Sequence, residues 1–381
     1  MQRHVAATTT VVMTVLCLVA SLHAAEDRAM HPALHDVRRI LFYGDSLTDG
    51  SSYPDYVVNT LNHVYRDADF VLLNSAVAGD TARDLLKRLE ADVIARDPDL
   101  VTICIGTNDC NGKRPVADYE ADLRAVVDGI LAHGAKVVMI LPSPFGNEQT
   151  EARFADYLAV MRKVAAEHDL PIADAHGVFI EGEAAGRQML GDGGVHHGAD
   201  GFEGMARAVL DALDLVDVPI VTDIHPWPGL LLDWQTSAPL PAAQVKNNFD
   251  PTAATGWHAY DRQAAIDAQP WWDAPFAARG AWMPFAVNKP DEPSIAFGRT
   301  VYDADQAGKA ELQIGGSRPL VVWLNGEEVW RGGRPHGYHP DADRVIVDLR
   351  AGENTIIVVC NFMAFIGIAP VQTPEGDDAG P

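Results

Sequence analysis

The stretch ILFYGDSLTDG, residues 40–50, decides the fold class of this chain, because it joins an apolar strand to a glycine-bounded polar loop. Unbroken apolar residues suit a strand that is covered on both faces of a sheet. Four further apolar runs follow, at residues 70–73, 100–105, 137–140 and 172–173. Amphipathic stretches, such as residues 81–96 and 116–131, lie between them. This alternation predicts an α/β domain with a doubly wound parallel sheet, whose ligands bind beyond the carboxyl ends of the strands.

The second half of the chain has a different pattern. All 8 Trp lie after residue 226, and helical periodicity disappears except around residues 261–268. Residues 310–314 alternate as a half-buried strand does, and the runs 320–324 and 327–330 flank Asn325-Gly326, a favoured hairpin turn. Residues 344–349 and 355–360 add two strands. We therefore predict a β-sandwich.

The length agrees with two domains, since about 150 residues per domain is usual and the chain has 381. We place the first domain at residues 38–215 and the second at 225–370. The net charge of −24 disfavours polyanionic partners, so we expect neither nucleic acid nor an anionic membrane surface as a partner.

The N-terminus is typical of a secretory signal peptide. Arg3 precedes the apolar run 11–20, which is too short to span a bilayer, and Ala24-Ala25 follow it. We expect residues 1–24 to be removed and the protein to be secreted or periplasmic, with no membrane span in its mature form. A retained anchor is the alternative. The mature chain keeps Cys104, Cys110 and Cys360, an odd number that excludes a complete disulfide framework.

Polar residues that could carry chemistry follow three successive strands. Ser46 lies after the first strand, Gly79 after the second and Asn108 after the third. A hydroxyl nucleophile, a backbone amide and a side-chain amide are the components of a nucleophilic site with an oxyanion hole. A base is supplied by the last loop before the final predicted helix, GDGGVHHGADGF, residues 191–202. A Ser that merely caps a helix is the alternative for Ser46.

These blocks resemble the SGNH, or GDSL-type, hydrolase family. The matching segments are GDSLTDG, the glycine of AVAGDT, the asparagine of GTND and a terminal VHHGADGF, over residues 38–215. The resemblance implies a flavodoxin-like three-layer fold. It also implies that Ser46 is the nucleophile, that His196 is the base, and that Gly79, Asn108 and the Ser46 amide hold the oxyanion.

The last block departs from the family pattern. The third member of the triad usually stands three residues before the histidine, where this chain has Gly193, and Asp192 is one residue further back. Asp192 can still reach the imidazole if the glycines bulge the loop; otherwise Ser46 and His196 work with a backbone carbonyl. His197 replaces the usual proline. We expect no metal or other cofactor, because adjacent histidines rarely converge on one ion.

The second half resembles the galactose-binding-like jelly-roll domains attached to carbohydrate-active enzymes. The resemblance rests on the hairpin around Asn325-Gly326 and the turn at residues 348–354. Exposed Trp side chains could stack on sugar rings. Alternatively, Trp323 and Trp330 belong to the core, and Trp271-Trp272 pack between the domains.

Together these features predict a secreted serine esterase that removes acyl groups, acetyl above all, from a carbohydrate ester. Lysophospholipase, arylesterase or thioesterase activity is the alternative within the family. A glycan-binding protein without catalytic activity is the alternative of another class, suggested by the displaced Asp192.

Overall fold

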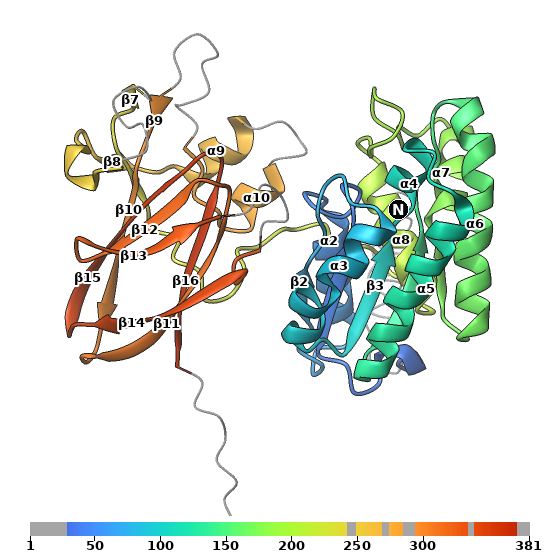
Figure 1. Cartoon of the computed structure of the whole chain (residues 1–381), viewed down its shortest axis with the longest axis horizontal. Helices are drawn as coiled ribbons and strands as arrows, with labels where there is room; N and C mark the ends of the chain where they lie inside the picture. Colours follow the sequence, from blue (N-terminus) through green and yellow to red (C-terminus); the bar gives the residue numbers. More distant parts are fainter. Residues whose placement is uncertain (1–28, 242–248, 269–273, 285–293, 334–338, 372–381) are drawn as a thin grey trace, which may run out of the picture.

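The computed structural model describes residues 29–241, 249–268, 274–284, 294–333 and 339–371. Figure 1 shows two units side by side, an α/β unit and a β unit, joined by an extended connection after α8. The predicted signal peptide, residues 1–24, and Trp271-Trp272 lie outside the described residues.

The α/β unit is built on five strands that are all parallel, in the order β2-β1-β3-β4-β5. Their bounds are β1 Arg39–Gly44, β2 Val71–Asn74, β3 Leu100–Cys104, β4 Lys136–Leu141 and β5 Ile172–Asp174. The doubly wound parallel sheet that the sequence predicts is therefore confirmed. The central strand β3 is buried along its whole length, which explains its unbroken apolar sequence.

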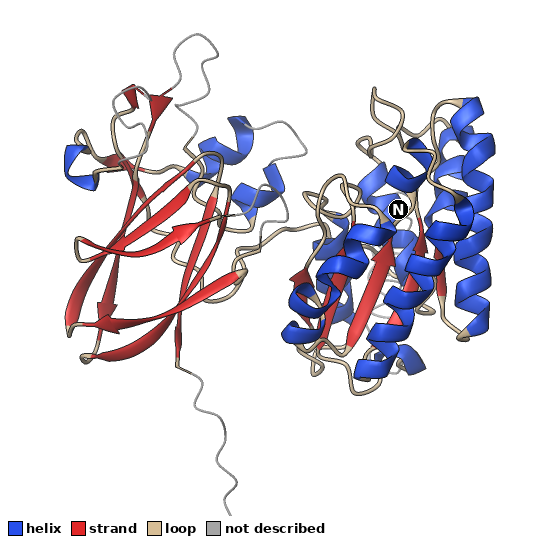
Figure 2. Ribbon diagram, in the orientation of Figure 1, coloured by secondary structure: helices blue, strands red, loops and turns tan. Residues whose placement is uncertain are grey.

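Helices cover both faces of this sheet and make three layers, as Figure 2 shows. The helices of the unit are α2 Tyr53–Val64, α3 Ala82–Asp92, α4 Thr107–Asn111, α5 Val116–His133, α6 Glu148–Glu167, α7 Ala175–Ala184 and α8 Gly201–Asp211. Helices α3 to α6 pack on one face, and α2, α7 and α8 pack on the other. Three 3₁₀ turns complete the described helical elements: η1 Pro32–Leu34, η2 Ile94–Arg96 and η4 Pro251–Ala253.

Helix α3 is shorter than the amphipathic stretch that predicts it. The pattern over residues 81–96 suggests a single helix, but α3 ends at Asp92 and η2 follows it. Asp97 then adopts a left-handed conformation with φ of +47°. The tighter turn places the Arg96 guanidinium 3.0 Å from the Ser75 hydroxyl, so a tertiary contact accompanies the break.

The β unit consists of antiparallel sheets, with strand orders β13-β12-β15-β10-β6-β8, β14-β11-β16 and β7-β9. The strands are β6 Gln235–Thr236, β7 Leu240–Pro241, β8 His258–Ala259, β9 Ser294–Ile295, β10 Gly298–Ala304, β11 Gly308–Gly316, β12 Leu320–Leu324, β13 Glu327–Gly332, β14 Asp343–Leu349, β15 Gly352–Cys360 and β16 Ala364–Pro370. Two short helices, α9 Arg262–Ala268 and α10 Ala274–Ala278, lie beside them. Apolar residues of the six- and three-stranded sheets share one core, which makes this unit a β-sandwich as predicted.

The hairpin at Asn325-Gly326 forms as the sequence predicts. β12 pairs with β13 in antiparallel register, and both turn residues have positive φ, +53° and +91°. Positive φ at both residues is what a two-residue hairpin turn needs if it is to match the twist of its two strands.

The described Trp residues do not form an exposed platform. Trp234, Trp282 and Trp323 are buried, and Trp227, Trp257 and Trp330 are half-buried. The interpretation of Trp323 as a core residue is therefore confirmed, since its ring packs 6.0 Å from that of Phe297. Stacking of sugars on exposed Trp finds no support among the described residues.

The two units are held together by a buried ion pair. Arg279, which directly follows α10, contacts Asp55 of α2, with 3.0 Å between Nε and Oδ2. The two side chains are only 1% and 5% exposed. A second pair joins Arg96 to Asp341 at 2.6 Å. Because breaking a buried pair leaves an uncompensated charge, the first pair fixes how the β unit lies against α2.

Within the described ranges, no helix has the length and apolar character needed to cross a membrane. The three cysteines Cys104, Cys110 and Cys360 are free and buried, so a bridge between Cys104 and Cys110 does not form.

Candidate active site

Ser46 and His196 come together at the carboxyl end of the sheet. Ser46 lies in the turn after β1, and His196 lies in the loop between α7 and α8. The His196 Nε2 atom is 2.9 Å from the Ser46 Oγ atom, although 150 residues separate them. A hydroxyl within hydrogen-bond distance of an imidazole is the arrangement that general-base activation of a serine requires.

The turn that carries Ser46 is fixed by its neighbours. The Asp45 carbonyl accepts hydrogen bonds from the amides of Thr48 and Asp49, both at 3.0 Å. A Cβ at Gly44 would overlap the carbonyl oxygen of Cys104, so only glycine allows β1 to run this close to β3. The conformation of the nucleophile turn is therefore set by both local bonds and sheet packing.

Gly79 lies in the turn after β2 with φ of +88°. No atom lies within 4 Å of where its Cβ would stand, so the backbone conformation, and not lack of space, requires glycine here. The amide of Ala78 donates to the Asp49 carboxylate at 3.1 Å, which ties this turn to the nucleophile loop.

Asn108, in α4, lies between the other two loops. Its Nδ2 atom donates to the Asp80 carbonyl at 2.9 Å and lies 3.4 Å from the Asp45 carboxylate. Because Asp45 precedes Ser46 and Asp80 follows Gly79, these bonds bring the three predicted oxyanion groups to one place. Within the described residues, the Ser46 and Gly79 amides donate to no protein acceptor, which leaves both available to a substrate oxygen.

Asp45 is a buried carboxylate that the sequence analysis did not single out. Its pKa is raised to about 7, chiefly by burial; the Leu47 amide, which donates to it at 3.0 Å, opposes the shift, and the nearby Asp109 and Asp80 charges add to it. Burial therefore favours the protonated, neutral form of this side chain next to the nucleophile.

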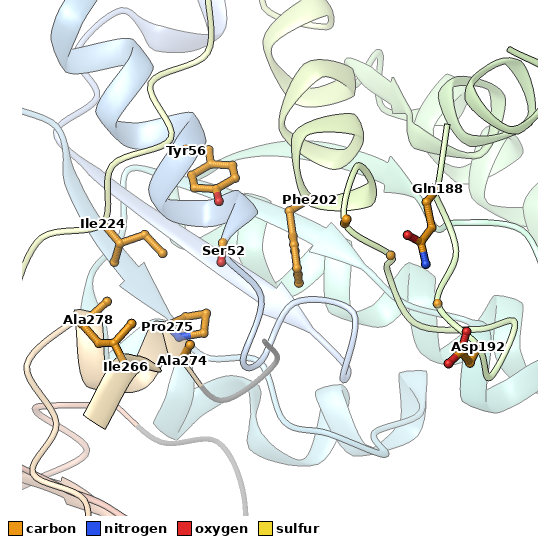
Figure 3. A pocket seen from close by; sticks show the side chains of 13 residues that line it. Ser52, Tyr56, Gln188, Asp192, Phe202, Ile224, Ile266, Ala274, Pro275 and Ala278 are labelled. Carbon is orange, nitrogen blue, oxygen red and sulfur yellow. The ribbon is translucent and has the colours of Figure 1, made fainter. Parts of the chain in front are cut away.

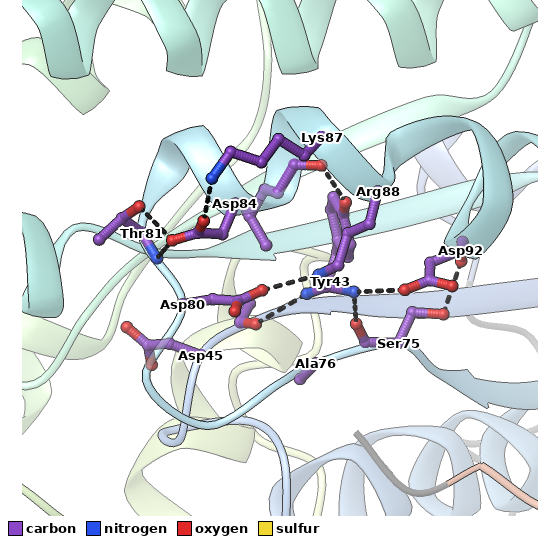
Figure 4. Close-up of polar contacts among 12 residues, drawn as sticks. Tyr43, Asp45, Ser75, Ala76, Asp80, Thr81, Asp84, Lys87, Arg88 and Asp92 are labelled. Atoms are coloured by element: carbon purple, nitrogen blue, oxygen red, sulfur yellow. Dashed lines mark hydrogen bonds and ion pairs between the residues drawn. The ribbon is translucent and has the colours of Figure 1, made fainter. Parts of the chain in front are cut away.

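Arg88 of α3 braces the loops around Gly79 and was also missed by the sequence analysis. Figure 4 shows its guanidinium among the carboxylates of Asp80 and Asp92, at 2.7 and 3.1 Å. The same group donates to the carbonyl of Ser75 and, at 3.3 Å, to that of Gly44. One half-buried cation thus joins the end of β1 to the loop after β2.

A second charged pair supports α4. The Asp109 carboxylate, which is fully buried, accepts from the Ala82 amide at 3.0 Å and from Arg114 at 2.9 Å. This pair connects the residue after Asn108 to the start of α3. The only sequence signals for such braces are spacings like Arg88–Asp92, one helical turn apart.

The loop that carries His196 is held mainly by its backbone. The Gly191 amide donates to the His196 carbonyl at 2.9 Å, and the Gly146 amide donates to the Gly194 carbonyl at 2.7 Å. The Ser143 hydroxyl lies 3.4 Å from the Val195 carbonyl. These bonds attach the loop to the segment after β4.

Asp192 does not join this arrangement. Its side chain is exposed, and in the described part of the chain it forms no hydrogen bond or ion pair with His196. No acceptor contacts His196 Nδ1 among those residues either. The structure therefore brings Ser46 and His196 together without a carboxylate, and the role of Asp192 as the third member stays a prediction.

The two adjacent histidines have different surroundings. Partial desolvation lowers the pKa of His196 below its usual value. His197 is buried between the rings of Phe179 and Phe202, and burial lowers its pKa to about 3. His197 is thus a neutral core residue, while His196 is neutral at pH 7 and able to accept a proton.

No group of three or more His, Cys, Asp or Glu side chains that could hold a metal ion occurs in the described segments.

The α/β unit is similar to known proteins. The GDSL-like lipase/acylhydrolase family model matches residues 42–203. An acetylxylan esterase from Geobacillus stearothermophilus is 35% identical over 175 residues, which cover 38% of this chain and 78% of that protein. The thioesterase 1/protease 1/lysophospholipase L1 of Escherichia coli (strain K12) is 28% identical over 171 residues, 42% of this chain and 76% of that one. The crystal structure of the Geobacillus acetylxylan esterase Axe2 covers 46% of this chain and 94% of its own, at 30% identity and a TM-score of 0.43.

The fold, the site and these relatives define an enzyme that hydrolyses ester bonds. The chain belongs to the GDSL-like lipase/acylhydrolase family. The family resemblance seen in the sequence is confirmed, and the alternative of a glycan-binding protein without catalytic activity is not supported.

Proposed function

We propose that this protein is a secreted or periplasmic serine esterase that removes acetyl groups from carbohydrate esters. The observation that carries the proposal is the 2.9 Å contact between Ser46 Oγ and His196 Nε2, beside the Asn108 amide. The acetyl and carbohydrate parts are supported by the 35% identity to an acetylxylan esterase. Export is supported by the apolar segment at residues 11–20.

The proposed mechanism has two steps. Ser46 Oγ attacks the ester carbonyl carbon while His196 Nε2 takes the hydroxyl proton. The resulting oxyanion is stabilised by the amides of Ser46 and Gly79 and by the Asn108 side chain. The alcohol leaves with the proton from His196, and the acyl-enzyme remains. A water molecule, deprotonated by His196, then releases acetate and restores Ser46.

A second candidate function is hydrolysis of long-chain lipid esters or thioesters, which is favoured by the 28% identity to the Escherichia coli protein. The resemblance of the β unit to galactose-binding-like domains favours the carbohydrate proposal, and the sandwich architecture supports it.

The test is release of acetate from acetylated xylan and from 4-nitrophenyl acetate by the full chain. We expect both activities, and we expect Ser46→Ala to lower kcat by roughly a thousandfold or more. Thr48→Ala, in the same turn, is the matched hydroxyl control. Wild-type rates in Ser46→Ala would overturn the nucleophile assignment, and activity confined to long-chain esters would favour the second candidate.

A further inference from the structure

A cleft of about 520 Å³ opens between the two units beside the candidate active site. Figure 3 shows that its walls come from both units. The α/β unit contributes Tyr56 and Phe202, and the β unit contributes Ile266, Ala274 and Ala278. Its size falls in the range of sites that hold small molecules.

The cleft adjoins the residues that carry the proposed chemistry. Gly191 and Asp192 line it and belong to the loop of His196, to which the Gly191 amide bonds at 2.9 Å. Ser52, six residues after Ser46, lines it as well. The cleft thus shares the loop of His196 and the segment that follows Ser46 with the candidate active site.

The wall of the cleft that the β unit forms is held in place by Arg279. Arg279 follows Ala278, contacts the Asp55 carboxylate with 3.0 Å between Nε and Oδ2, and donates to the carbonyl of Ser51. Its guanidinium also lies 5.5 Å from the centre of the Trp227 ring. The residue that anchors the β unit thus stands next to a residue that lines the cleft.

The lining indicates what the cleft holds. Tyr56 and Phe202 are half-buried aromatic side chains, and Ser52, Gln188 and Asp192 add polar groups among apolar ones. Aromatic faces with a few hydrogen-bonding groups suit a sugar ring, which is apolar on its faces and polar at its edge. An acetyl group has only two carbons and leaves a volume of this size to the alcohol part of an ester.

We propose that this cleft binds the sugar units of the acetylated substrate, so that α9 and α10 of the β unit determine specificity for a glycan. This proposal rests on the proposed function, since it takes acetyl as the acyl group. The β unit then acts as a wall of the active site, and not as a separate module that captures polysaccharide at a distance.

The experiment fills the cleft from the β side in the full-length protein. Ala278→Trp and, separately, Ala274→Trp are compared with Ala264→Trp, whose exposed position on α9 lies outside the lining. Each variant is assayed on an O-acetylated xylo-oligosaccharide, on 4-nitrophenyl acetate and on 4-nitrophenyl decanoate. The rate on 4-nitrophenyl acetate also reports whether each variant is folded.

We expect the cleft variants to raise KM for the oligosaccharide roughly tenfold or more, because a bulky ring removes substrate binding. Rates on 4-nitrophenyl acetate should stay within about twofold of wild type. The Ala264→Trp control should change neither the KM for the oligosaccharide nor the rate on 4-nitrophenyl acetate. An unchanged KM for the oligosaccharide in both cleft variants would overturn the proposal. Selective loss of activity on 4-nitrophenyl decanoate would also overturn it, because the cleft would then bind the acyl chain. Failure of the proposed function is distinct, because the wild-type protein would then not act on the oligosaccharide at all.

Discussion

The nucleophile side and the base side of the active site are held in different ways. On the nucleophile side, Arg88 and the Asp109–Arg114 pair hold three loops through half-buried charged hydrogen bonds. On the base side, the loop of His196 has glycines at 191, 193 and 194 and is held mainly by backbone bonds, with the Glu183 carboxylate accepting from the Leu190 amide. The difference indicates that the donors of the oxyanion hole are preorganised, while the base can shift as substrate binds.

The largest effect that would sharpen this comparison comes from Asn108→Ala. Loss of one oxyanion donor typically costs about 2.7–4 kcal/mol of barrier, so we expect kcat to fall roughly a hundredfold or more with little change in KM. Steady-state kinetics on 4-nitrophenyl acetate measure it. The control is Asn111→Ala at the other end of α4. A fall of less than about threefold would mean that Asn108 only ties the loops together.

A smaller effect is expected from Arg88→Met, which removes the brace but touches no substrate group. The Asp80 carboxylate then loses its partner, and the Gly79 turn and the Asn108 bond to the Asp80 carbonyl are no longer held in place. Since small misplacements of catalytic groups cost up to about a hundredfold, we expect kcat to fall roughly tenfold to a hundredfold.

Arg83→Met is the matched control for that variant, because Arg83 lies on the same helix with its side chain 59% exposed. Thermal unfolding of both variants separates activity from stability. If Arg88→Met lowered Tm but left kcat at the level of the Arg83 control, the brace would serve stability alone.

The fold could be predicted from the sequence wherever local patterns determine it. Apolar runs predict the five strands of the parallel sheet, and the turn residues Asn325-Gly326 predict the hairpin. The break of α3 at Asp92 could not be predicted, because the amphipathic pattern continues through it and the contact of Arg96 with Ser75 that accompanies it is tertiary. The burial of Trp234 and Trp282 likewise depends on how the sheets pack.

The candidate site was predictable where a motif marks a chemical role. Ser46, Gly79, Asn108 and His196 stand in recognisable loops, and the structure brings them to one edge of the sheet. Although the Arg88–Asp92 pair has a helical spacing, the charged contacts between residues distant in the sequence were not predictable. Arg279 and Asp55, for example, are 224 residues apart and lie in different units.

The smallest effect is expected on the base side, from Asp192→Asn. The Asp192 side chain is exposed and forms no bond with His196 in the described part of the structure. We therefore expect kcat/KM to change by less than about threefold. Asp200→Asn, in the following turn, is the control.

The pH profile of kcat/KM gives this prediction a second readout. His196 must be neutral to accept the proton of Ser46, and desolvation lowers its pKa. Activity should therefore persist below the usual pKa of a histidine and fall only as the pH drops through the lowered value. A carboxylate on Nδ1 would raise that pKa, so in Asp192→Asn the acidic limb should not move. If the acidic limb of Asp192→Asn moved to lower pH and kcat fell by about 10⁴-fold, Asp192 would instead reach His196 once substrate is bound.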